Sequence, residues 1–105
     1  MFTVTFVLHE KPGTDRAEAL RYWRETHGPI AAKVPGVRRY VQQHAVGAPE
    51  GDPPFLGVAS LSFDDQDAFA AAGQSAEFAA AVADVDNFAD PALVTAFTED
   101  VVIVG

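Results

Sequence analysis

Two hydrophobic periodicities alternate along this 105-residue chain, and their order limits its possible folds more than any other feature. Apolar residues recur at every second position over residues 2–8, and this period is typical of a strand. Residues 15–27 have instead the composition and the capping residues of a helix. Two more strand-like segments, 37–45 and 55–63, are separated by a loop dense in Gly and Pro at 47–54. The first half of the chain therefore predicts the order strand, helix, strand, strand.

The rest of the chain adds one more helix and one more strand. An Ala-rich stretch that begins at Asp64 has regularly spaced apolar residues and is broken near Gly73, so we expect a helix in two pieces. Residues 94–104 end in Val-Val-Ile-Val and predict a closing strand. The order βαββαβ predicts an α+β fold of the ferredoxin-like type, an antiparallel four-stranded sheet with two helices on one face. The length leaves room for one core, so residues 1–105 are expected to form a single domain.

This arrangement leaves the other face of the sheet without a helix to cover it. Hydrophobic residues make up 49% of the chain, and a domain this small buries only part of its apolar surface when it folds alone. An apolar sheet face left bare would be a large exposed patch. We therefore expect a homodimer in which the same face of a second copy covers it.

Composition excludes several classes of partner. The formal net charge is −8, which opposes binding to nucleic acid and to anionic membrane surfaces, and no apolar stretch is long enough to span a bilayer. There is no cysteine, which removes disulfides, thiolate nucleophiles and thiolate metal ligands. The N-terminal residues show no export signal, so a cytoplasmic protein is expected.

One face of the first predicted helix carries a candidate catalytic residue. Leu20, Trp23 and His27 are spaced so that they share the face that looks at the core. Gly28-Pro29 is expected to stop or kink the helix, which puts His27 at a helix end beside an apolar cleft. Imidazole can take and give a proton near neutral pH, so His27 is a candidate acid or base. The alternative is that His27 only caps the C-terminus of its own helix.

The second predicted strand has an unusual polar face. Tyr40 and His44 share strand parity with Arg38 and Gln42, so one face carries four polar groups where a buried strand would be apolar. Such a face either meets water or lines a wet cavity. The simpler interpretations are that Tyr40 is a core residue with its hydroxyl at the rim, and that His44 is an exposed strand end.

Other kinds of site are poorly supported. The three histidines lie on different elements at spacings unlike any zinc or iron ligand motif, so no metal site is expected. Acid pairs such as Asp64-Asp65 and Asp84/Asp86 are interpreted as helix caps and solvated turns. The chain has no glycine-rich phosphate loop and no Gly-x-Ser-x-Gly nucleophile elbow. No cofactor is predicted.

Three segments together resemble one known family. Residues 22–44, which contain Trp-Arg-Glu-Thr-His-Gly-Pro and the strand after it, resemble the most characteristic segment of the EthD family. Residues 57–64 are similar to the third strand of that family and to the acidic start of its second helix, and 83–90 resemble its acidic and aromatic turn. The chain departs from the family at Leu56, where an acidic residue is often found, so a role of that acid is not carried over.

The resemblance implies a dimeric α+β barrel. Its members include cofactor-free isomerases and proteins found beside oxidation systems for small organic compounds, and related barrels include monooxygenases, polyketide cyclases and haem proteins. Fold alone does not choose among these activities.

Residues and resemblance together give one functional expectation with two alternatives. The chain is expected to be a cofactor-independent enzyme of isomerase, cyclase or monooxygenase type that acts on a small, apolar or aromatic carbonyl compound. His27 would be the acid or base and Tyr40 the polar anchor, which the family-like placement brings near His27, while Trp23 and His44 would bind the ligand. The alternatives are a non-catalytic ligand-binding or accessory protein and a haem-binding barrel that uses His27 or His44.

Overall fold

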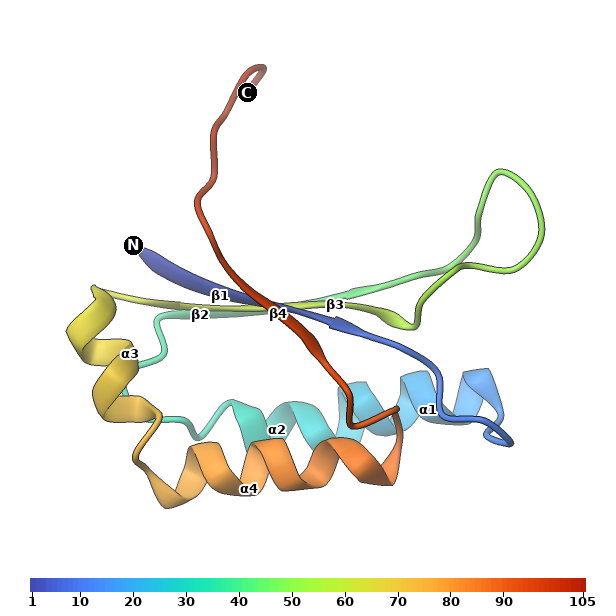
Figure 1. The fold of residues 1–105 in the computed structure, drawn as a ribbon, viewed down its shortest axis with the longest axis horizontal. Coiled ribbons are helices and arrows are strands. Elements are labelled where there is room, and N and C mark those ends of the chain that lie inside the picture. Colours follow the sequence, from blue (N-terminus) through green and yellow to red (C-terminus); the bar gives the residue numbers. More distant parts are fainter.

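Four strands form one antiparallel sheet in the computed structural model, which describes residues 1–105 (Figure 1). The sheet has the order β2-β3-β1-β4, so the first strand lies in the interior and the second and fourth form the edges. The strands are β1 (Phe2–Leu8), β2 (Arg39–His44), β3 (Gly57–Phe63) and β4 (Val94–Thr98). This confirms the antiparallel four-stranded sheet that the sequence predicts.

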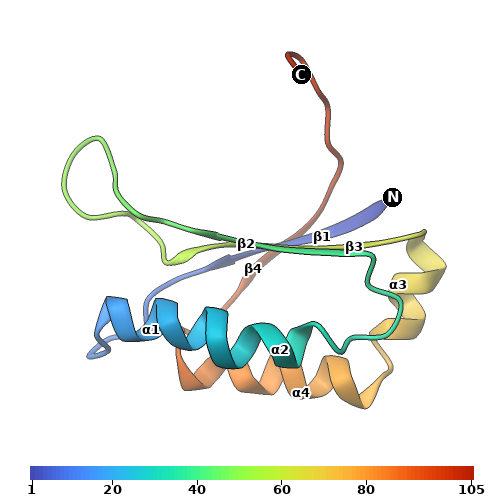
Figure 2. The same ribbon diagram turned by 180° about the vertical axis from the view of Figure 1, so that it is seen from behind.

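The helical segments lie on one side of the sheet, as Figures 1 and 2 show from opposite directions. Three consecutive segments follow β1: α1 (Arg16–Tyr22), the π-helical turn η1 (Trp23–His27) and α2 (Gly28–Ala31). After β3 the expected two-piece helix forms as α3 (Gln66–Ala72) and α4 (Ala76–Asp84), and the 3₁₀ turn η2 (Val85–Asn87) ends it. Side chains of Asp15, Asp65 and Ser75 cap the N-termini of α1, α3 and α4.

Gly28-Pro29 does not stop the first helix, which was one of the two effects expected of it. The helical path continues through α2 to Ala31, and His27 lies inside it rather than at an end. The reason is the π turn: the N–H of Gly28 bonds to the carbonyl of Trp23, five residues back. Pro29 then sits near the start of a new α-helical segment, where its missing N–H costs little.

The closing strand is shorter than the sequence predicts. β4 pairs with β1 from Val94 to Thr98, and the residues after Thr98 belong to no strand. The β-branched run that indicated strand over 94–104 is present, but its second half lies beyond the register of β1 and has no partner strand in this chain. It leaves the sheet on the side opposite the helices (Figures 1 and 2).

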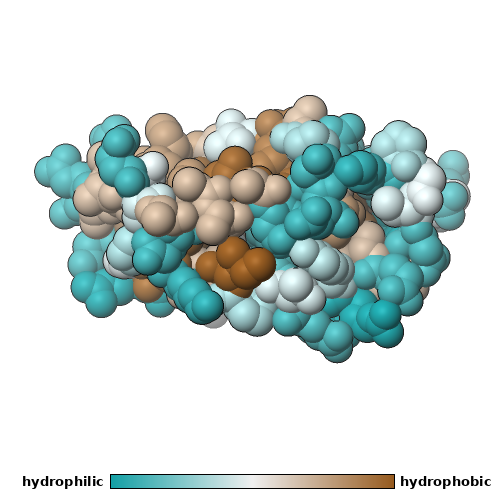
Figure 3. All heavy atoms as spheres, turned by 90° about the horizontal axis from the view of Figure 1, so that it is seen from below, coloured by the Kyte–Doolittle hydropathy of each residue, from teal (hydrophilic) through white to brown (hydrophobic).

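The core lies between the sheet and the helices. Val4 and Leu8 lie on the same face of β1 and are buried in this core, and Trp23 of η1 is fully buried. The aromatic residues Phe63 and Phe88 complete its two ends. The outer surface of the helix layer, seen from below in Figure 3, is hydrophilic at its ends with apolar groups exposed between them. None of the helices is long and apolar enough to span a lipid bilayer.

The uncovered face of the sheet is less apolar than the sequence analysis expects. Register and alternation assign to it small hydroxyl residues, valines and a few longer polar side chains. Its members are Thr3, Thr5, Val7, Arg39, Val41, Gln43, Val58, Ser60, Ser62, Val94, Ala96 and Thr98. The hydroxyls pair with one another, Thr3 with Ser62 at 2.8 Å and Thr5 with Thr98 at 2.6 Å.

Candidate functional site

His27 lies between the sheet and the helix layer, with only 7% of its surface exposed. Its Nδ1 is 2.8 Å from Oδ2 of Asp84 at the end of α4. A carboxylate can only accept a hydrogen bond, so this contact assigns the proton of the neutral ring to Nδ1. The Nε2 atom then carries the free lone pair, on the side of the ring away from Asp84.

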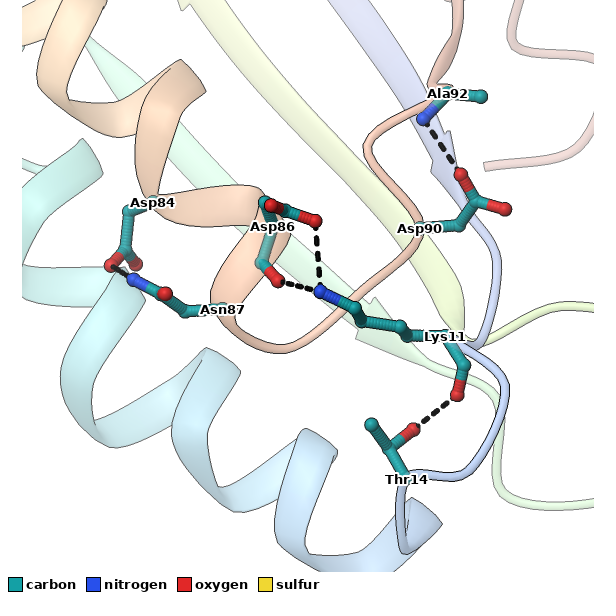
Figure 4. A network of polar contacts seen from close by, with 7 residues as sticks. All are labelled: Lys11, Thr14, Asp84, Asp86, Asn87, Asp90 and Ala92. Carbon is teal, nitrogen blue, oxygen red and sulfur yellow. Dashed lines mark hydrogen bonds and ion pairs between the residues drawn. The ribbon is translucent and has the colours of Figure 1, made fainter.

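Asp84 is held in place by two further donors. The hydroxyl of Tyr22 donates to its Oδ1 at 2.8 Å. The side-chain amide of Asn87 donates to the same oxygen at 2.9 Å, as Figure 4 shows. Partial burial acts to raise the pKa of Asp84, but the hydrogen bonds from Asn87, His27 and Tyr22 outweigh it and lower the pKa below its ordinary value. The same bond to the Asp84 carboxylate, together with burial, raises the pKa of Tyr22. Asp84 is therefore kept ionised beside His27.

A lysine ties the turn that carries Asn87 to the end of β1. Lys11 donates to the backbone carbonyl of Asp86 at 2.6 Å and to its Oδ1 at 2.9 Å (Figure 4). Both side chains are well exposed, so the ion pair contributes little stability by itself. Its effect is to fix η2 against the loop that begins α1, and so to fix the position of Asn87.

A small cavity opens beside His27, between the sheet and helices η1, α2 and α4. It has a volume of about 50 Å³ and is lined almost entirely by apolar side chains. Trp23, His27 and Tyr40 all lie on its wall, and the half-exposed Val82 lies among the residues of α4 that line it. The imidazole is the most polar group in this lining, so a ligand here would meet one titratable group in otherwise apolar surroundings.

A chain of hydrogen bonds runs along β2 toward the cavity. His44 Nε2 lies 2.7 Å from Oε1 of Gln42, and the Gln42 amide nitrogen donates to the Tyr40 hydroxyl at 2.7 Å and to the Trp23 carbonyl at 2.9 Å. Because the Tyr40 oxygen accepts this bond, its own proton is free for another acceptor. Burial raises the pKa of Tyr40, so this proton is retained at neutral pH.

Trp23 has a buried donor without a partner. Its Nε1 is inaccessible to water and makes no hydrogen bond. The indole ring stacks on His44 with ring centroids 4.6 Å apart, and its six-membered ring packs against Gly57 of β3. A buried N–H without an acceptor costs about 1–3 kcal/mol.

The structure brings three of the four predicted site residues to the cavity. Trp23, His27 and Tyr40 line it, whereas His44 is outside the lining, with its ring stacked on Trp23. The π turn places His27 in the lining of the same cavity as Tyr40, although His27 is not at a helix end. His27 does not cap the C-terminus of its own helix, because the helical path continues past it through α2 and its Nδ1 bonds to Asp84.

The four polar residues expected on one face of β2 do not all lie in the same environment. Tyr40, Gln42 and His44 point toward the helices, whereas Arg38 lies before the strand and forms an exposed ion pair with Asp64. Burial, with the nearby charge of Arg24, lowers the pKa of His44, so this ring is neutral where it stacks on Trp23.

The residues that hold His27 are not indicated by the local sequence pattern. Asp84 was interpreted as part of a solvated turn, yet its side chain is only 10% exposed and faces His27. Asp84 and Asn87 are three residues apart at the end of an amphipathic helix, which was the available signal. No group of three or more His, Asp or Glu side chains is arranged to hold a metal ion.

The fold and site define a ferredoxin-like α+β protein with a small, mainly apolar cavity and a single histidine–carboxylate pair. The model of the EthD domain matches residues 11–92, and the chain belongs to the EthD family. This confirms the resemblance found in the sequence. No curated protein sequence matches the chain.

Solved structures agree with the family. An EthD (ethyl tert-butyl ether d) family protein from Bacillus halodurans is 27% identical, with a TM-score of 0.79 over 96% of this chain and 100% of that one. A dimeric ferredoxin-like protein of unknown function from Thermobifida fusca is 13% identical, with a TM-score of 0.72 over 92% and 88%. A putative antibiotic biosynthesis monooxygenase from Nitrosomonas europaea is 16% identical, with a TM-score of 0.67 over 97% and 100%. The last two likenesses show the fold alone.

Proposed function

We propose that this chain is a cofactor-independent enzyme that moves a proton on a small apolar carbonyl compound, with His27 as the acid and base. The observation that carries the proposal is the position of the His27 ring. One nitrogen is bonded to the Asp84 carboxylate, and the ring lies in the wall of an apolar cavity. This is the arrangement of a general base with a group that orients it.

The chemistry follows from the assigned tautomer. Nε2 of His27 takes a proton from the carbon next to the ligand carbonyl, and the electron pair of that C–H bond forms the enolate. Asp84 stabilises the imidazolium that results, without taking the proton itself. Return of the proton to a different atom of the ligand completes an isomerisation. In a cyclisation the enolate carbon would bond to the carbon of a second carbonyl of the same ligand, the π bond of that carbonyl would break, and the resulting alkoxide would take the proton back from His27.

Two donors are available for the oxygen that gains charge. The Tyr40 hydroxyl has a free proton because its oxygen accepts from Gln42, and the Trp23 indole N–H has no partner. Both residues line the same cavity as His27. An enolate oxygen held by such donors in low-dielectric surroundings is stabilised more than it would be in water. This favours a carbonyl ligand over a purely hydrocarbon one.

Asp84 also connects the site with the surface. On its outer side it lines a groove between α2 and α4, together with Lys33 and Glu77. A proton held by His27 therefore lies one residue from solvent, although the cavity itself is apolar. This supports exchange of the proton with water between turnovers.

The cavity limits the size of the ligand. A volume of about 50 Å³ holds a few water molecules, so a cyclic ligand requires outward movement of side chains such as Phe78, Val82 and Leu93 in the cavity lining. A haem group is far larger, and Nδ1 of His27 is already bonded to Asp84, so the haem alternative has little support. A non-catalytic ligand-binding protein uses the same cavity and is the second candidate.

We also propose that the functional unit is a homodimer and that it resides in the cytoplasm. The uncovered sheet face and the Thermobifida fusca neighbour described as dimeric support the first part. The acidic net charge and the absence of cysteine fit the second part and still oppose nucleic acid as a partner.

The test uses proton exchange rather than the natural substrate. 2-Tetralone, a cyclic ketone with acidic α-protons, is incubated with the protein in D₂O, and deuterium uptake is followed by NMR. Uptake above the buffer rate that falls by roughly 10²–10⁴-fold in His27→Ala supports the proposal. His9→Ala is the matched control, because His9 lies at the end of β1 outside the cavity lining and should leave exchange unchanged. Binding of 2-tetralone without any enhanced exchange would favour the non-catalytic alternative.

A further inference from the structure

Phe6 is only partly buried, although it lies on the inner face of an interior strand. Its neighbours on that face of β1, Val4 and Leu8, are 0% and 2% exposed. Phe6 also lines the cavity beside His27. A partly exposed side chain between two buried ones indicates that the helix layer does not fully cover the sheet at this point.

Val82 of α4 marks the same opening from the helix side. It lines the cavity but is 49% exposed, whereas Ala81 beside it lines the cavity and is buried. Phe78 lies four residues earlier, on the same side of the helix, and is partly exposed as well. A side chain that lines a cavity and also meets solvent lies at the mouth of that cavity, so Val82 and Phe78 form one rim of an opening.

The edge strand β4 and the residue before it supply the facing rim. Leu93 precedes the strand, lines the cavity and is partly exposed. The register places Thr95 opposite Phe6, and this exposed side chain is too small to cover the phenyl ring. Towards α3 the layer is closed again, because Phe97 packs on Phe2 with ring centroids 4.8 Å apart. The opening is therefore confined to the stretch between Leu93 and Phe97.

The two sides of the helix layer are held to the sheet in different ways. On the β2 side, the Gln42 amide donates to the Trp23 carbonyl of η1 at 2.9 Å and to the Tyr40 hydroxyl at 2.7 Å. On the other side, the side-chain hydrogen bonds of α4 run through Asp84 to the first helix and to η2, and none runs to β4. Only apolar contacts therefore close the gap between α4 and β4, and they can separate without loss of a hydrogen bond.

We propose that the cavity takes its ligand through this mouth between α4 and β4, and that Val82 sets the size of the ligand that enters. The inference rests on the proposed function and deepens it by naming the ligand class of that site. The mouth is framed by Phe6, Phe78, Val82 and Leu93, none of which is charged. With a net charge of −8 on the chain, such a mouth selects neutral apolar ligands and excludes carboxylates and phosphates. It lies on the helix side of the sheet, so a dimer formed through the uncovered face leaves it open (Figure 1).

The first experiment measures access to the cavity without any assumption about activity. Trp23 is the single tryptophan, is fully buried and lines the cavity, so its fluorescence reports a quencher that enters. We expect quenching by neutral acrylamide to rise roughly twofold or more in Val82→Ala and to fall as much in Val82→Phe, because the mouth limits entry. The anion iodide should quench none of the proteins. Ala79→Phe is the matched control, since Ala79 is exposed on the same helix outside the cavity lining, and it should leave quenching unchanged.

The second experiment measures size selection in the exchange assay. Deuterium uptake is compared for cyclopentanone and 2-tetralone, a smaller and a larger cyclic ketone with acidic α-protons. Val82→Ala should raise the ratio of the two kcat/KM values in favour of 2-tetralone by roughly tenfold, and Val82→Phe should lower it by as much, because a methylene-sized change in an apolar pocket alters selectivity by this order. Ala79→Phe should keep the wild-type ratio.

The outcomes separate this proposal from the proposed function. A wild-type chain without exchange above the buffer rate overturns the proposed function, and the quenching series then decides the mouth alone. Equal acrylamide quenching in wild type, Val82→Ala and Val82→Phe overturns the mouth, even where His27-dependent exchange is intact. An unchanged ketone ratio in both variants overturns Val82 as the size determinant, and iodide quenching as strong as that by acrylamide overturns the exclusion of anions. Should Val82→Phe fail to fold, Val82→Ala carries the same comparisons.

Discussion

Asp84 Oδ2 and His27 Nδ1 lie 2.8 Å apart, although the two residues are separated by 57 positions in the chain. The contact joins the two helical segments that cover the sheet, and it decides which imidazole nitrogen remains free. The contact has a structural role as well as a chemical one. The hydrogen bonds from Tyr22 and Asn87 that hold Asp84 also connect α4 with α1 and with η2.

The first prediction concerns the stability that Asp84 provides. Asp84→Ala leaves the His27 N–H and the Tyr22 hydroxyl without their acceptor, and it should lower the free energy of unfolding by about 1–3 kcal/mol. Asp86→Ala is the matched control, two residues away in an exposed pair with Lys11, and should cost about 0–1 kcal/mol. Urea unfolding measures both. Equal losses in the two variants would mean that the buried carboxylate has no special structural role.

The second prediction concerns pH. The pKa of Asp84 is lowered in the folded protein from its model-compound value of 3.8. Its stabilising contribution is therefore fully present above that value and is lost as pH falls through the lower folded pKa. We expect the melting temperature of the wild-type chain to fall more steeply below pH 4 than that of Asp84→Asn. Parallel curves for the two proteins would show that another group controls acid unfolding.

The third prediction concerns Gly57, where β3 passes under Trp23. A Cβ at this position would lie 2.5 Å from Cζ3 of Trp23 and would also collide with the backbone carbonyl of Gln43. Gly57→Ala should therefore destabilise the fold by about 1–3 kcal/mol and shift the Trp23 fluorescence. Gly47→Ala is the control, because nothing lies within 4 Å of its added Cβ. A silent Gly57→Ala variant would contradict the described packing of Trp23.

The fourth prediction separates anchoring from packing at Tyr40. Tyr40→Phe keeps the ring in the cavity wall and removes the hydroxyl, while Gln42 retains its bond to the Trp23 carbonyl. The melting temperature should change little, and the rate of 2-tetralone exchange should fall roughly tenfold, which corresponds to about 1.4 kcal/mol of lost stabilisation. Exchange at the wild-type rate would remove Tyr40 from the proposed site.

Much of the fold followed from local patterns, and the errors have physical causes. Period-two alternation located β1 and β3, and the turn residues between 45 and 57 located the hairpin. The stop expected at Gly28-Pro29 does not occur because the N–H of Gly28 bonds to the Trp23 carbonyl in a π turn, and Pro29 lies in the first turn of the next helical segment. No residue preference indicates such a turn. The end of β4 was wrong because strand length depends on the partner, and β1 offers no register beyond Thr98.

The site was only partly predictable for a similar reason. Helical spacing placed Trp23 and His27 on the inner face, and strand parity indicated Tyr40, because these periods are local. The partner of His27 depends on how α4 packs against the first helix, which is a long-range contact. Asp84 therefore looked like any acidic residue at a helix end.

The most direct test of the central claim is the tautomer of His27 in the free protein. Long-range ¹H–¹⁵N NMR at a pH where the ring is neutral distinguishes a proton on Nδ1 from a proton on Nε2. We predict the Nδ1–H form in the wild-type chain, with the lone pair of Nε2 free for a ligand proton, and loss of that preference in Asp84→Ala. An Nε2–H form in the wild-type chain, or the same tautomer with and without the Asp84 carboxylate, would contradict the account of His27 as an oriented base.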